Sequence, residues 1–359
     1  MIVVTGTRGI PNIMGGVETH CEQLYPRIVR LGQDVTVIRR KSYVTPDNVA
    51  DAYEGVKLVD LYCPRKKAIE AAVHTFLAVL KARRMGADIV HIHAIGPGLM
   101  VPLARLLGLK VVVTNHGPDY DRDKWGGVAK WALKMGERLA TKYANEVIVI
   151  SQVIKDLLKE QYGRTDTHLI YNGVPAPTHA HLPAYFAELG IEEGNYLLCC
   201  CRFVPEKNLH HVLDALAEVD LKGCRVVWAG DDDSAYATAL KERAAAMGVV
   251  LTGFVRGERL HSLLTNARGY ILPSSHEGLP IALLEAMSYE LPVIVSDIPA
   301  NKEVGLAEEC YFPVGDVSAL AHRMQAVVDA PSQRVTYDLS PYDWDHIARQ
   351  TNEIYQRLS

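Results

Sequence analysis

The sequence predicts an α/β protein made of two doubly wound, Rossmann-like domains whose parallel sheets face each other across a cleft. Short apolar runs alternate with segments of helical periodicity through almost all of the 359 residues. Strands that alternate with helices form parallel sheets covered on both faces. A proline-rich stretch divides this series in two, and the length suits two domains of ordinary size.

The first half carries a complete strand–helix series. Continuous apolar runs are typical of strands buried on both faces, and apolar residues three or four positions apart are typical of helices. The expected strands are Ile2–Thr5, Asp34–Ile38, Asp88–His93, Lys110–Thr114, Glu146–Ile150 and Thr167–Tyr171. The expected helices span residues 17–31, 69–85, 97–107, 127–144 and 152–161.

A second series of the same kind follows. Its expected strands are Tyr196–Cys201, Arg225–Ala229, Val249–Leu251, Gly269–Leu272, Pro292–Val295 and Cys310–Phe312. Its expected helices span residues 208–219, 234–247, 257–266, 280–289 and 316–329. Residues 341–358 are interpreted as a final helix.

The best domain boundary lies just after residue 172. An Asn-Gly turn at 172–173 is followed by three prolines before residue 184, and proline continues neither a helix nor a central strand. The first domain is therefore expected at residues 1–172 and the second at residues 173–340. Ligands of such sheets bind at the carboxyl ends of the strands, so two facing domains predict a ligand cleft.

Composition excludes several classes of protein. With 48% hydrophobic and 22% charged residues, the chain can bury a sizeable core and is not disordered. No run approaches the roughly 18–20 apolar residues of a membrane-spanning helix. Met1 leads directly into an apolar strand, so no secretory signal is expected. Seven cysteines without paired C-x-x-C spacing indicate reduced thiols in a cytoplasmic protein.

Charge is spread unevenly along the chain. The formal net charge is −4, made up of +7 over residues 1–172 and −11 over the remainder. Such asymmetry suggests two surfaces that meet different partners. The basic half suits phosphates or an anionic membrane, and chance is the alternative. No nucleic acid partner is expected.

The strongest motif occupies residues 274–287, where a strand ends and a helix begins. Pro280 near the helix start is favoured there. Such a helix start offers unpaired N–H groups and a positive dipole end, which suit a diphosphate. Glu277 and Glu285 lie eight residues apart around this turn. A carboxylate accepts two hydrogen bonds from a vicinal diol, so one glutamate suits a ribose and the other a sugar ring.

A second motif follows the first strand of the second series. Arg202 and Lys207 stand five residues apart in the run Arg-Phe-Val-Pro-Glu-Lys-Asn. Cleavage of a sugar–diphosphate bond builds negative charge on the leaving oxygen, and fixed cations stabilise that charge. Without a metal motif, these two side chains are the natural substitutes. The alternative is an ordinary solvated loop.

A glycine-rich loop follows the first strand of the chain. It contains Gly6-Thr7-Arg8-Gly9 and then Gly15-Gly16-Val17-Glu18. Glycines let a backbone approach a ligand closely. The spacing is not G-x-G-x-x-G, so a dinucleotide cofactor is not supported. A simple turn before the next helix is the alternative.

Taken together, the motifs resemble the E-x7-E signature and the R-x4-K pair of GT-B glycosyltransferases of family 4, over nearly the whole chain. The resemblance implies that Glu277 binds hydroxyls of the donor sugar and that Glu285 binds the nucleotide ribose. Arg202 and Lys207 would stabilise the leaving diphosphate. The backbone of Gly278, Leu279 and Pro280 would meet the phosphates.

In the first domain, the resemblance places Gly15 and Gly16 beside the donor phosphates and the acceptor. Family 4 enzymes often carry a His-Gly pair at the end of a central strand with the imidazole near the donor sugar, which implies this role for His116. The acceptor side is assigned to Glu18, Asp119 and Arg122.

Residues 114–126 also resemble a bacterial rhamnosyltransferase-like subgroup of capsule and O-antigen assembly. In that subgroup an acidic residue is common at the position of His116, and an aromatic follows the acid at Asp119. Tyr120 fits this pattern and His116 departs from it. The identity of the donor therefore does not follow from this resemblance.

The expected helix 127–144 carries several basic residues. Lys130, Lys134 and Arg138 are four apart and share one face. This face suits an anionic membrane or a lipid diphosphate acceptor, which would place the protein on the inner side of a membrane. An ordinary solvated face is the alternative.

The resemblance implies a retaining, metal-independent glycosyltransferase without a cofactor. It would transfer a hexosyl-type sugar from a UDP-, dTDP- or GDP-sugar to a glycan or polyprenyl-diphosphate-linked acceptor in bacterial surface polysaccharide synthesis. In GT-B enzymes the last helix, here within residues 341–359, packs back on the first domain. The alternatives are a nucleotide-sugar 2-epimerase of GT-B fold and a non-catalytic nucleotide-sugar-binding protein.

Overall fold

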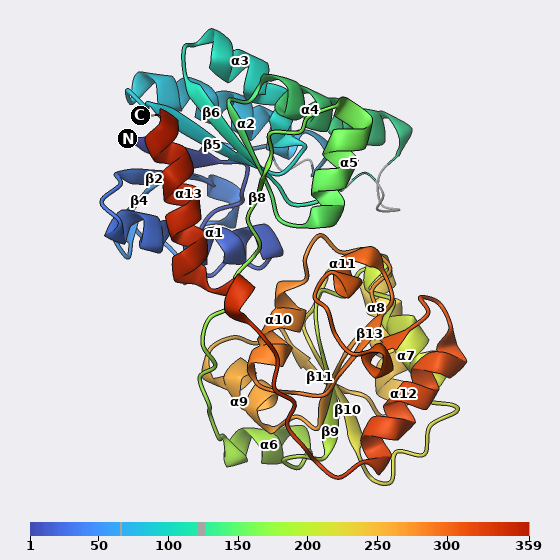
Figure 1. Ribbon diagram of the computed structural model, residues 1–359. Helices are drawn as coiled ribbons and strands as arrows, with labels where there is room; N and C mark the ends of the chain where they lie inside the picture. Colours follow the sequence, from blue (N-terminus) through green and yellow to red (C-terminus); the bar gives the residue numbers. More distant parts are fainter. Residues whose placement is uncertain (65–66, 119, 121–125, 359) are drawn as a thin grey trace. The chain divides into compact units, whose positions relative to one another are not determined.

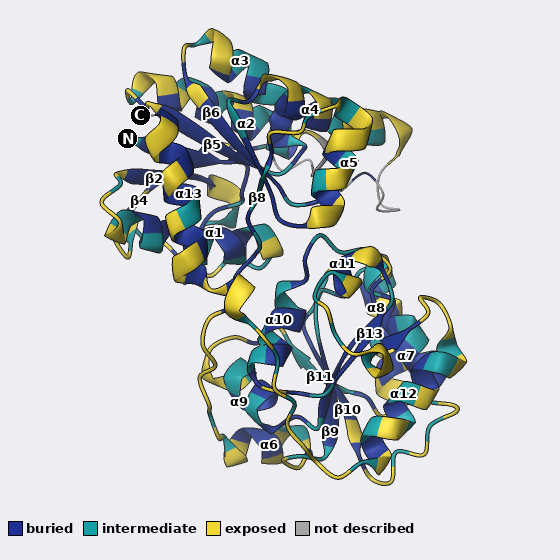
Figure 2. Cartoon of the chain, viewed as in Figure 1, coloured by how far each residue is buried: buried dark blue, intermediate teal, exposed yellow. Residues whose placement is uncertain are grey.

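The computed structural model describes residues 1–64, 67–118, 120 and 126–358. The chain forms two compact units, one of Met1–Gly173 with Pro341–Ser359 and one of Val174–Ser340 (Figure 1). Each unit contains a parallel sheet with helices packed on it, so the predicted α/β class with two doubly wound sheets is confirmed. In Figure 2 the strands of both sheets are largely dark blue, which marks them as buried.

Unit 1 is built on a sheet in the order β3-β4-β2-β1-β5-β6-β7-β8 among its described residues. The strands are β1 (Ile2–Thr5), β2 (Val35–Arg40), β3 (Ala52–Tyr53), β4 (Val56–Leu61), β5 (Ile89–His93), β6 (Lys110–Asn115), β7 (Glu146–Val149) and β8 (His168–Leu169). Every described pairing is parallel except β3 with β4. The strand order reverses beside β1, and β1 pairs with β2 on one side and β5 on the other. Loops at such a switch point are where ligands of doubly wound sheets bind.

The helices of unit 1 include one from the end of the chain. They are α1 (Gly16–Arg30), α2 (Lys67–Arg84), α3 (Val101–Leu106), α4 (Gly127–Tyr143), α5 (Gln152–Tyr162) and α13 (Trp344–Leu358). In Figure 1, α13 runs beside α1. Its apolar face contributes Trp344, Ile347 and Tyr355 to the core that α1 and the sheet also build.

Unit 2 has a wholly parallel sheet in the order β11-β10-β9-β12-β13-β14. The strands are β9 (Tyr196–Cys200), β10 (Arg225–Ala229), β11 (Val250–Gly253), β12 (Gly269–Leu272), β13 (Val293–Ser296) and β14 (Tyr311–Phe312). The helices are α6 (Pro183–Leu189), α7 (Leu209–Ala215), α8 (Ala235–Ala246), α9 (Glu258–Asn266), α10 (Ile281–Ser288), α11 (Pro299–Lys302) and α12 (Val317–Asp329). The order reverses beside β9, so the loops after β9 and β12 flank the switch point.

Some elements were not predicted. β4 mixes buried, half-buried and exposed positions and so lacks the continuous apolar run that marks the other strands. Proline occupies the first position of both α6 and α11, where its fixed φ suits a helix start. In α6 that proline had been interpreted only as part of the connecting stretch.

Close backbone packing fixes the turn after β5. The 3-10 helix η2 (Pro97–Met100) lies against α4, and both elements carry a glycine at the contact. A Cβ at Gly136 would stand 2.2 Å from the backbone oxygen of Ile95, and one at Gly98 would stand 2.7 Å from the backbone oxygen of Gly136. Side chains are therefore excluded at both positions.

Candidate functional site

In unit 2 the loops after β9 and β12 are bound to each other. The backbone N–H of Ser275 donates to the backbone oxygen of Glu206 at 2.9 Å. Asn208, at the start of α7 with φ 49°, donates from Nδ2 to the backbone oxygen of Pro273 at 3.1 Å. Because β9 and β12 are neighbours, both loops emerge at the same edge of the sheet. The predicted residues of both loops are thereby held together.

Lys207 and Glu277 form an ion pair at this edge. The Lys207 ammonium donates to Oε1 of Glu277, and the two side chains are 18% and 11% exposed. Lys207 ends the 3-10 helix η4 (Pro205–Lys207), and Glu277 lies in the turn before α10. Arg202 is half-buried in the same loop as Lys207. The structure thus joins one residue of the R-x4-K pair to the first glutamate of E-x7-E.

Glu285 lies in the second turn of α10. Burial raises the pKa of its carboxyl to about 7. Burial raises the pKa values of Cys200 and Tyr270, and the negative charge of Glu285 adds to both shifts. No hydrogen bond or ion pair to its carboxyl is formed by the residues that the structure describes. Glu285 is half-buried, and a carboxyl with a raised pKa and no partner among the described residues is a candidate for ligand binding.

The start of α10 supplies a second type of ligand group. Gly278 is half-buried, whereas Leu279 and Pro280 are buried, and Pro280 is the residue before the helix. The first N–H groups of a helix lack intrahelical acceptors and carry the positive end of its dipole. They are therefore suited to a phosphate group, next to the Lys207–Glu277 pair.

Buried polar residues to which the sequence motifs gave no role hold this edge in place. Asn301 donates from Nδ2 to the backbone oxygen of Ser296 at 2.9 Å and to its Oγ at 3.1 Å. The Ser296 hydroxyl in turn donates to the backbone oxygen of Ser274. A lone buried Asn or Ser leaves no periodic or spacing signal in the sequence.

In unit 1 the glycine loop folds around Glu18. The buried carboxylate of Glu18 accepts from the backbone N–H of Arg8 at 2.9 Å and from the Thr7 hydroxyl at 3.1 Å. Gly15 has φ 151°, and a Cβ there would stand 2.0 Å from Oε2 of Glu18. Gly16 begins α1 with open space around its Cα. Glu18 therefore fixes the shape of the loop, whatever further role it has.

A cluster of histidines lies where α1, β5 and β6 meet. Nδ1 of His93 and Nε2 of His116 are 3.0 Å apart, and His20 stands edge-on to both rings. Behind them, Nε2 of His91 contacts the Thr114 hydroxyl at 2.7 Å. Desolvation lowers the pKa of His20 to about 4 and that of His91 to about 3. It also holds the pKa values of His93 and His116 well below their usual range, so the cluster is neutral at pH 7.

Of the remaining sequence predictions, Asp119 and Arg122 lie outside the described residues. His116 is half-buried and directly follows β6, at the carboxyl edge of the sheet as expected. The roles assigned to the site residues in both units stay predictions.

Comparisons with known proteins agree with these motifs. The family model described as Glycosyltransferase Family 4 matches residues 14–176, and the model described as Glycosyl transferases group 1 matches residues 194–330. A GDP-mannose:cellobiosyl-diphosphopolyprenol alpha-mannosyltransferase of Xanthomonas oryzae is 30% identical, covering 78% of this chain and 77% of the relative. The chain belongs to glycosyltransferase family 4. An alpha-D-kanosaminyltransferase of Streptomyces kanamyceticus is 28% identical over 81% of this chain and 78% of the relative.

Solved structures confirm the GT-B fold of this glycosyltransferase. A sucrose-phosphate synthase from Thermosynechococcus elongatus aligns with a TM-score of 0.84 at 20% identity, covering 99% of this chain and 98% of the other. Anabaena HepE in complex with UDP-glucose aligns with a TM-score of 0.73 at 17% identity, covering 99% of both chains. The rhamnosyltransferase-like subgroup stays a prediction.

The basic helix of this glycosyltransferase is α4. Lys134 and Arg138 are exposed and Lys130 is half-buried, while Trp131, which directly follows Lys130, is 63% exposed. The Lys134 ammonium lies over the ring of Tyr120, 5.0 Å from its centroid. Within the part of the chain that the structure describes, no helix combines the length and apolar character needed to span a bilayer.

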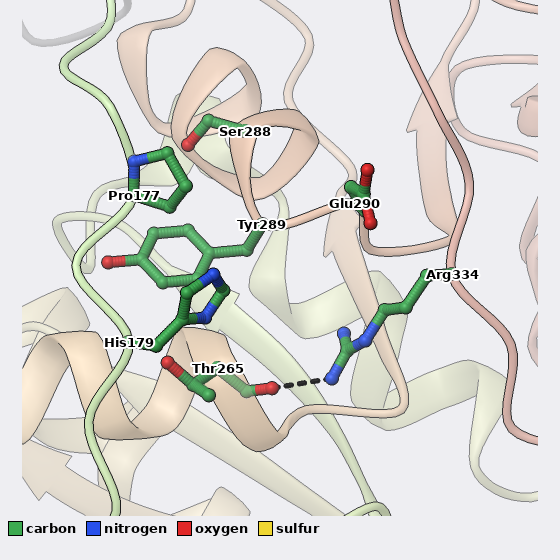
Figure 3. A pocket seen from close by; sticks show the side chains of 7 residues that line it. All are labelled: Pro177, His179, Thr265, Ser288, Tyr289, Glu290 and Arg334. Carbon is green, nitrogen blue, oxygen red and sulfur yellow. Dashed lines mark hydrogen bonds between the residues drawn. The ribbon is translucent and has the colours of Figure 1, made fainter.

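One pocket of about 380 Å³ lies apart from the motif residues, at the far end of α10 (Figure 3). The Tyr289 hydroxyl accepts from the backbone N–H of Thr178 at 3.1 Å and so ties the connecting stretch to α10. Arg334 donates to the backbone oxygen of Thr265 across the pocket floor. The pocket is lined by Pro177, His179, Thr265, Ser288, Tyr289, Glu290 and Arg334. It contains none of the predicted site residues.

Proposed function

We propose that this glycosyltransferase transfers a hexosyl-type sugar from a nucleoside diphosphate donor, with retention of anomeric configuration and without a metal ion at the diphosphate. The main support for this proposal is the set of groups gathered at the carboxyl edge of the unit 2 sheet. There, the Lys207–Glu277 ion pair lies beside the start of α10, and the half-buried carboxyl of Glu285 has a raised pKa and no partner among the described residues. Cation, helix start and carboxylates are the groups that a sugar diphosphate needs.

Each group has a distinct task in this proposal. The ammonium of Lys207 and the guanidinium of Arg202 stabilise the negative charge that develops on the leaving phosphate. The N–H groups at the start of α10 bind the diphosphate before and after cleavage. Glu277 accepts hydrogen bonds from the donor sugar, and Glu285 accepts them from the ribose diol. Two cations replace the charge that a metal ion otherwise supplies.

Membership of glycosyltransferase family 4 supports the proposed retaining mechanism. The acceptor hydroxyl attacks from the side on which the diphosphate leaves, and a leaving-group oxygen takes its proton. The new glycosidic bond forms as the sugar–phosphate bond breaks, and the nucleoside diphosphate departs with its charge held by Arg202 and Lys207. This scheme needs no side-chain base.

The relatives support the class of donor and acceptor. The Xanthomonas relative is named for GDP-mannose and a diphosphopolyprenol acceptor, and Anabaena HepE binds UDP-glucose. We therefore propose a UDP-, GDP- or dTDP-sugar donor and a glycan or polyprenyl-diphosphate-linked acceptor of bacterial surface polysaccharide synthesis.

We further propose a cytoplasmic location with α4 against the inner face of the membrane. The exposed Trp131, Lys134 and Arg138 suit the boundary between headgroups and acyl chains. Co-sedimentation with anionic vesicles should fall in a Lys134→Glu/Arg138→Glu variant. Unchanged sedimentation would remove the membrane contact from the proposal.

The donor is identified by a binding and turnover screen. UDP-, GDP-, dTDP- and ADP-sugars are tested for thermal stabilisation and for release of nucleoside diphosphate, with and without added Mg²⁺. We expect one donor to stabilise the wild type and a Glu188→Ala control, which alters an exposed residue of α6, but not Glu285→Ala. Slow hydrolysis without added Mg²⁺ is expected for the same donor.

A second variant tests the leaving-group role. Arg202→Ala should lower turnover by the equivalent of about 2–4 kcal/mol, in analogy with the loss of one oxyanion donor. Near-normal turnover would exclude this role. Release of nucleoside diphosphate that never depends on an acceptor would favour the 2-epimerase reaction, and binding without turnover would favour a non-catalytic protein. Failure of every donor and free nucleotide to bind would refute the proposal.

A further inference from the structure

We propose that His20, His93 and His116 form a Zn²⁺ site in unit 1. One nitrogen from each ring lies within 4.8 Å of the other two. His20 comes from α1, His93 ends β5 and His116 directly follows β6. Because β5 and β6 are neighbours and α1 follows β1 on the other side of β5, three consecutive strands of the sheet bring these rings together.

His20 is held in the form that a metal ion requires. Its Nδ1 lies 2.9 Å from Oδ1 of Asn172, and an amide oxygen only accepts hydrogen bonds. The proton of His20 is therefore on Nδ1, and Nε2 carries a bare lone pair. The side chain is 3% exposed, and Nε2 has no hydrogen-bond partner among the described residues. A buried acceptor without a donor costs free energy, and a bound cation would supply the missing partner.

His93 is oriented in a corresponding way. The Tyr25 hydroxyl contacts Nε2 of His93 at 2.5 Å and Nδ1 of His91 at 3.0 Å. It can accept the proton of His93 Nε2 while it donates to His91. This leaves Nδ1 of His93 as the lone pair that faces His116. Metal-binding histidines almost always donate their other N–H to an oxygen in this manner, which fixes the ring and its tautomer.

The distances and ligand types favour zinc. Imidazole nitrogens bind Zn²⁺ at about 2.0–2.1 Å in a tetrahedron, which places neighbouring nitrogens about 3.3 Å apart. The 3.0 Å between His93 and His116 is already near this value, and the His20 nitrogen lies within 4.8 Å of both, so it has to move closer for all three to bind one ion. Three neutral imidazoles suit Zn²⁺, whereas Mg²⁺ and Ca²⁺ prefer oxygen ligands. His116 is half-buried, and water would complete the tetrahedron as the fourth ligand.

The proposed zinc site shares His116 with the position that the family resemblance assigns near the donor sugar, but it shares no residue with the groups assigned to the diphosphate. The groups assigned to the diphosphate belong to unit 2, whereas the three histidines belong to unit 1. A zinc ion there would link α1 to the ends of β5 and β6 and so stabilise unit 1. The ion would also bind the imidazole of His116 as one of its ligands.

The first experiment measures metal binding directly. Protein stripped with a chelator is titrated with Zn²⁺ and with Co²⁺, whose visible spectrum reports coordination geometry and thiolate ligands. We expect one tight site per chain, a tetrahedral Co²⁺ spectrum and no thiolate charge-transfer band. His20→Gln and His116→Gln should each weaken binding at least tenfold, whereas His346→Gln, which changes an exposed residue of α13, should not.

A second variant tests the supporting hydrogen bond. Tyr25→Phe keeps all three ligands but removes the acceptor for His93, and should weaken Zn²⁺ binding about 10–100-fold. Hydrogen exchange adds a readout of location, because Zn²⁺ should slow exchange in peptides of β5 and β6 and leave unit 2 unchanged. Hydrogen exchange measured without metal shows whether each variant is folded.

The proposal is overturned by any of three results. Stripped wild-type protein that binds no Zn²⁺ would mean that the histidines form only a hydrogen-bonded cluster. A thiolate band would place the metal on cysteines. Equal affinity in wild type, His20→Gln and His116→Gln would place it elsewhere in the chain.

Discussion

Glu285→Gln should make the stability of unit 2 less dependent on pH. Burial raises the pKa of this carboxyl from 4.5 to about 7 in the folded state. The folded protein therefore binds a proton that the unfolded chain has released between these values. The contribution of Glu285 to stability is fully present below pH 4.5, declines as the pH rises, and is lost above pH 7.

The size of the effect follows from the shift. A shift of this extent corresponds to about 3 kcal/mol, because each pKa unit is about 1.4 kcal/mol at 25 °C. Glutamine has nearly the same shape and never ionises. The stability of the variant relative to wild type should therefore increase by about 3 kcal/mol between pH 4 and pH 8.

Hydrogen exchange by mass spectrometry is the suitable assay, because the chain has two units and a single melting curve would mix them. Peptides from β9 and β12 report the opening of unit 2, and peptides from β5 report unit 1 as an internal control. Glu188→Gln, at an exposed position of α6, is the matched variant and should show no such pH dependence. If the stability of unit 2 in Glu285→Gln differs from that of the wild type by the same amount at every pH from 4 to 8, the raised pKa does not belong to this carboxyl.

Three further predictions concern packing and charge. Lys207→Gln should destabilise unit 2 by about 1–3 kcal/mol by leaving a partly buried carboxylate without its cation, and the added change Glu277→Gln should restore most of this in a double-mutant cycle; additive losses would argue against the pair. Gly136→Ala should lower the free energy of unfolding of unit 1 by about 1–3 kcal/mol or more in chemical denaturation, because the new methyl group meets the backbone oxygen of Ile95. An unchanged free energy of unfolding would show that α4 shifts to make room. Ser151→Ala should cost about 1 kcal/mol in the same assay, since its hydroxyl caps α5 by accepting from the third residue beyond it, and Ser151→Thr should retain most of that stability.

Most of the fold was predictable because its strands are continuous apolar runs. β1 and β12 were predicted with the bounds that the structure has, since every residue in them is buried. β4 was missed because the exposed, charged residues Lys57 and Asp60 interrupt its apolar run. A run buried on both faces is recognisable without its neighbours, whereas a half-buried strand depends on which face the sheet covers.

The sites divide in a similar way. Glu277 and Glu285 are close in sequence, and their spacing together with the resemblance to family 4 singled them out. The histidine cluster was not predicted beyond His116, since His20 and His93 are far from it in the chain and meet only through the strand order. The raised pKa of Glu285 comes from burial by other parts of the fold. No sequence pattern around Glu285 predicts this burial.

The position of α13 has a consequence for synthesis of the chain. Unit 1 needs Trp344, Ile347 and Tyr355 to complete its core, yet the ribosome makes these residues only after all of unit 2. Unit 2 has all its strands together in one segment and can close during translation. Until α13 is made, the face of α1 that packs against it in the folded protein has no partner from α13. During that interval this face is a natural target for chaperones, and the unit made first is completed last.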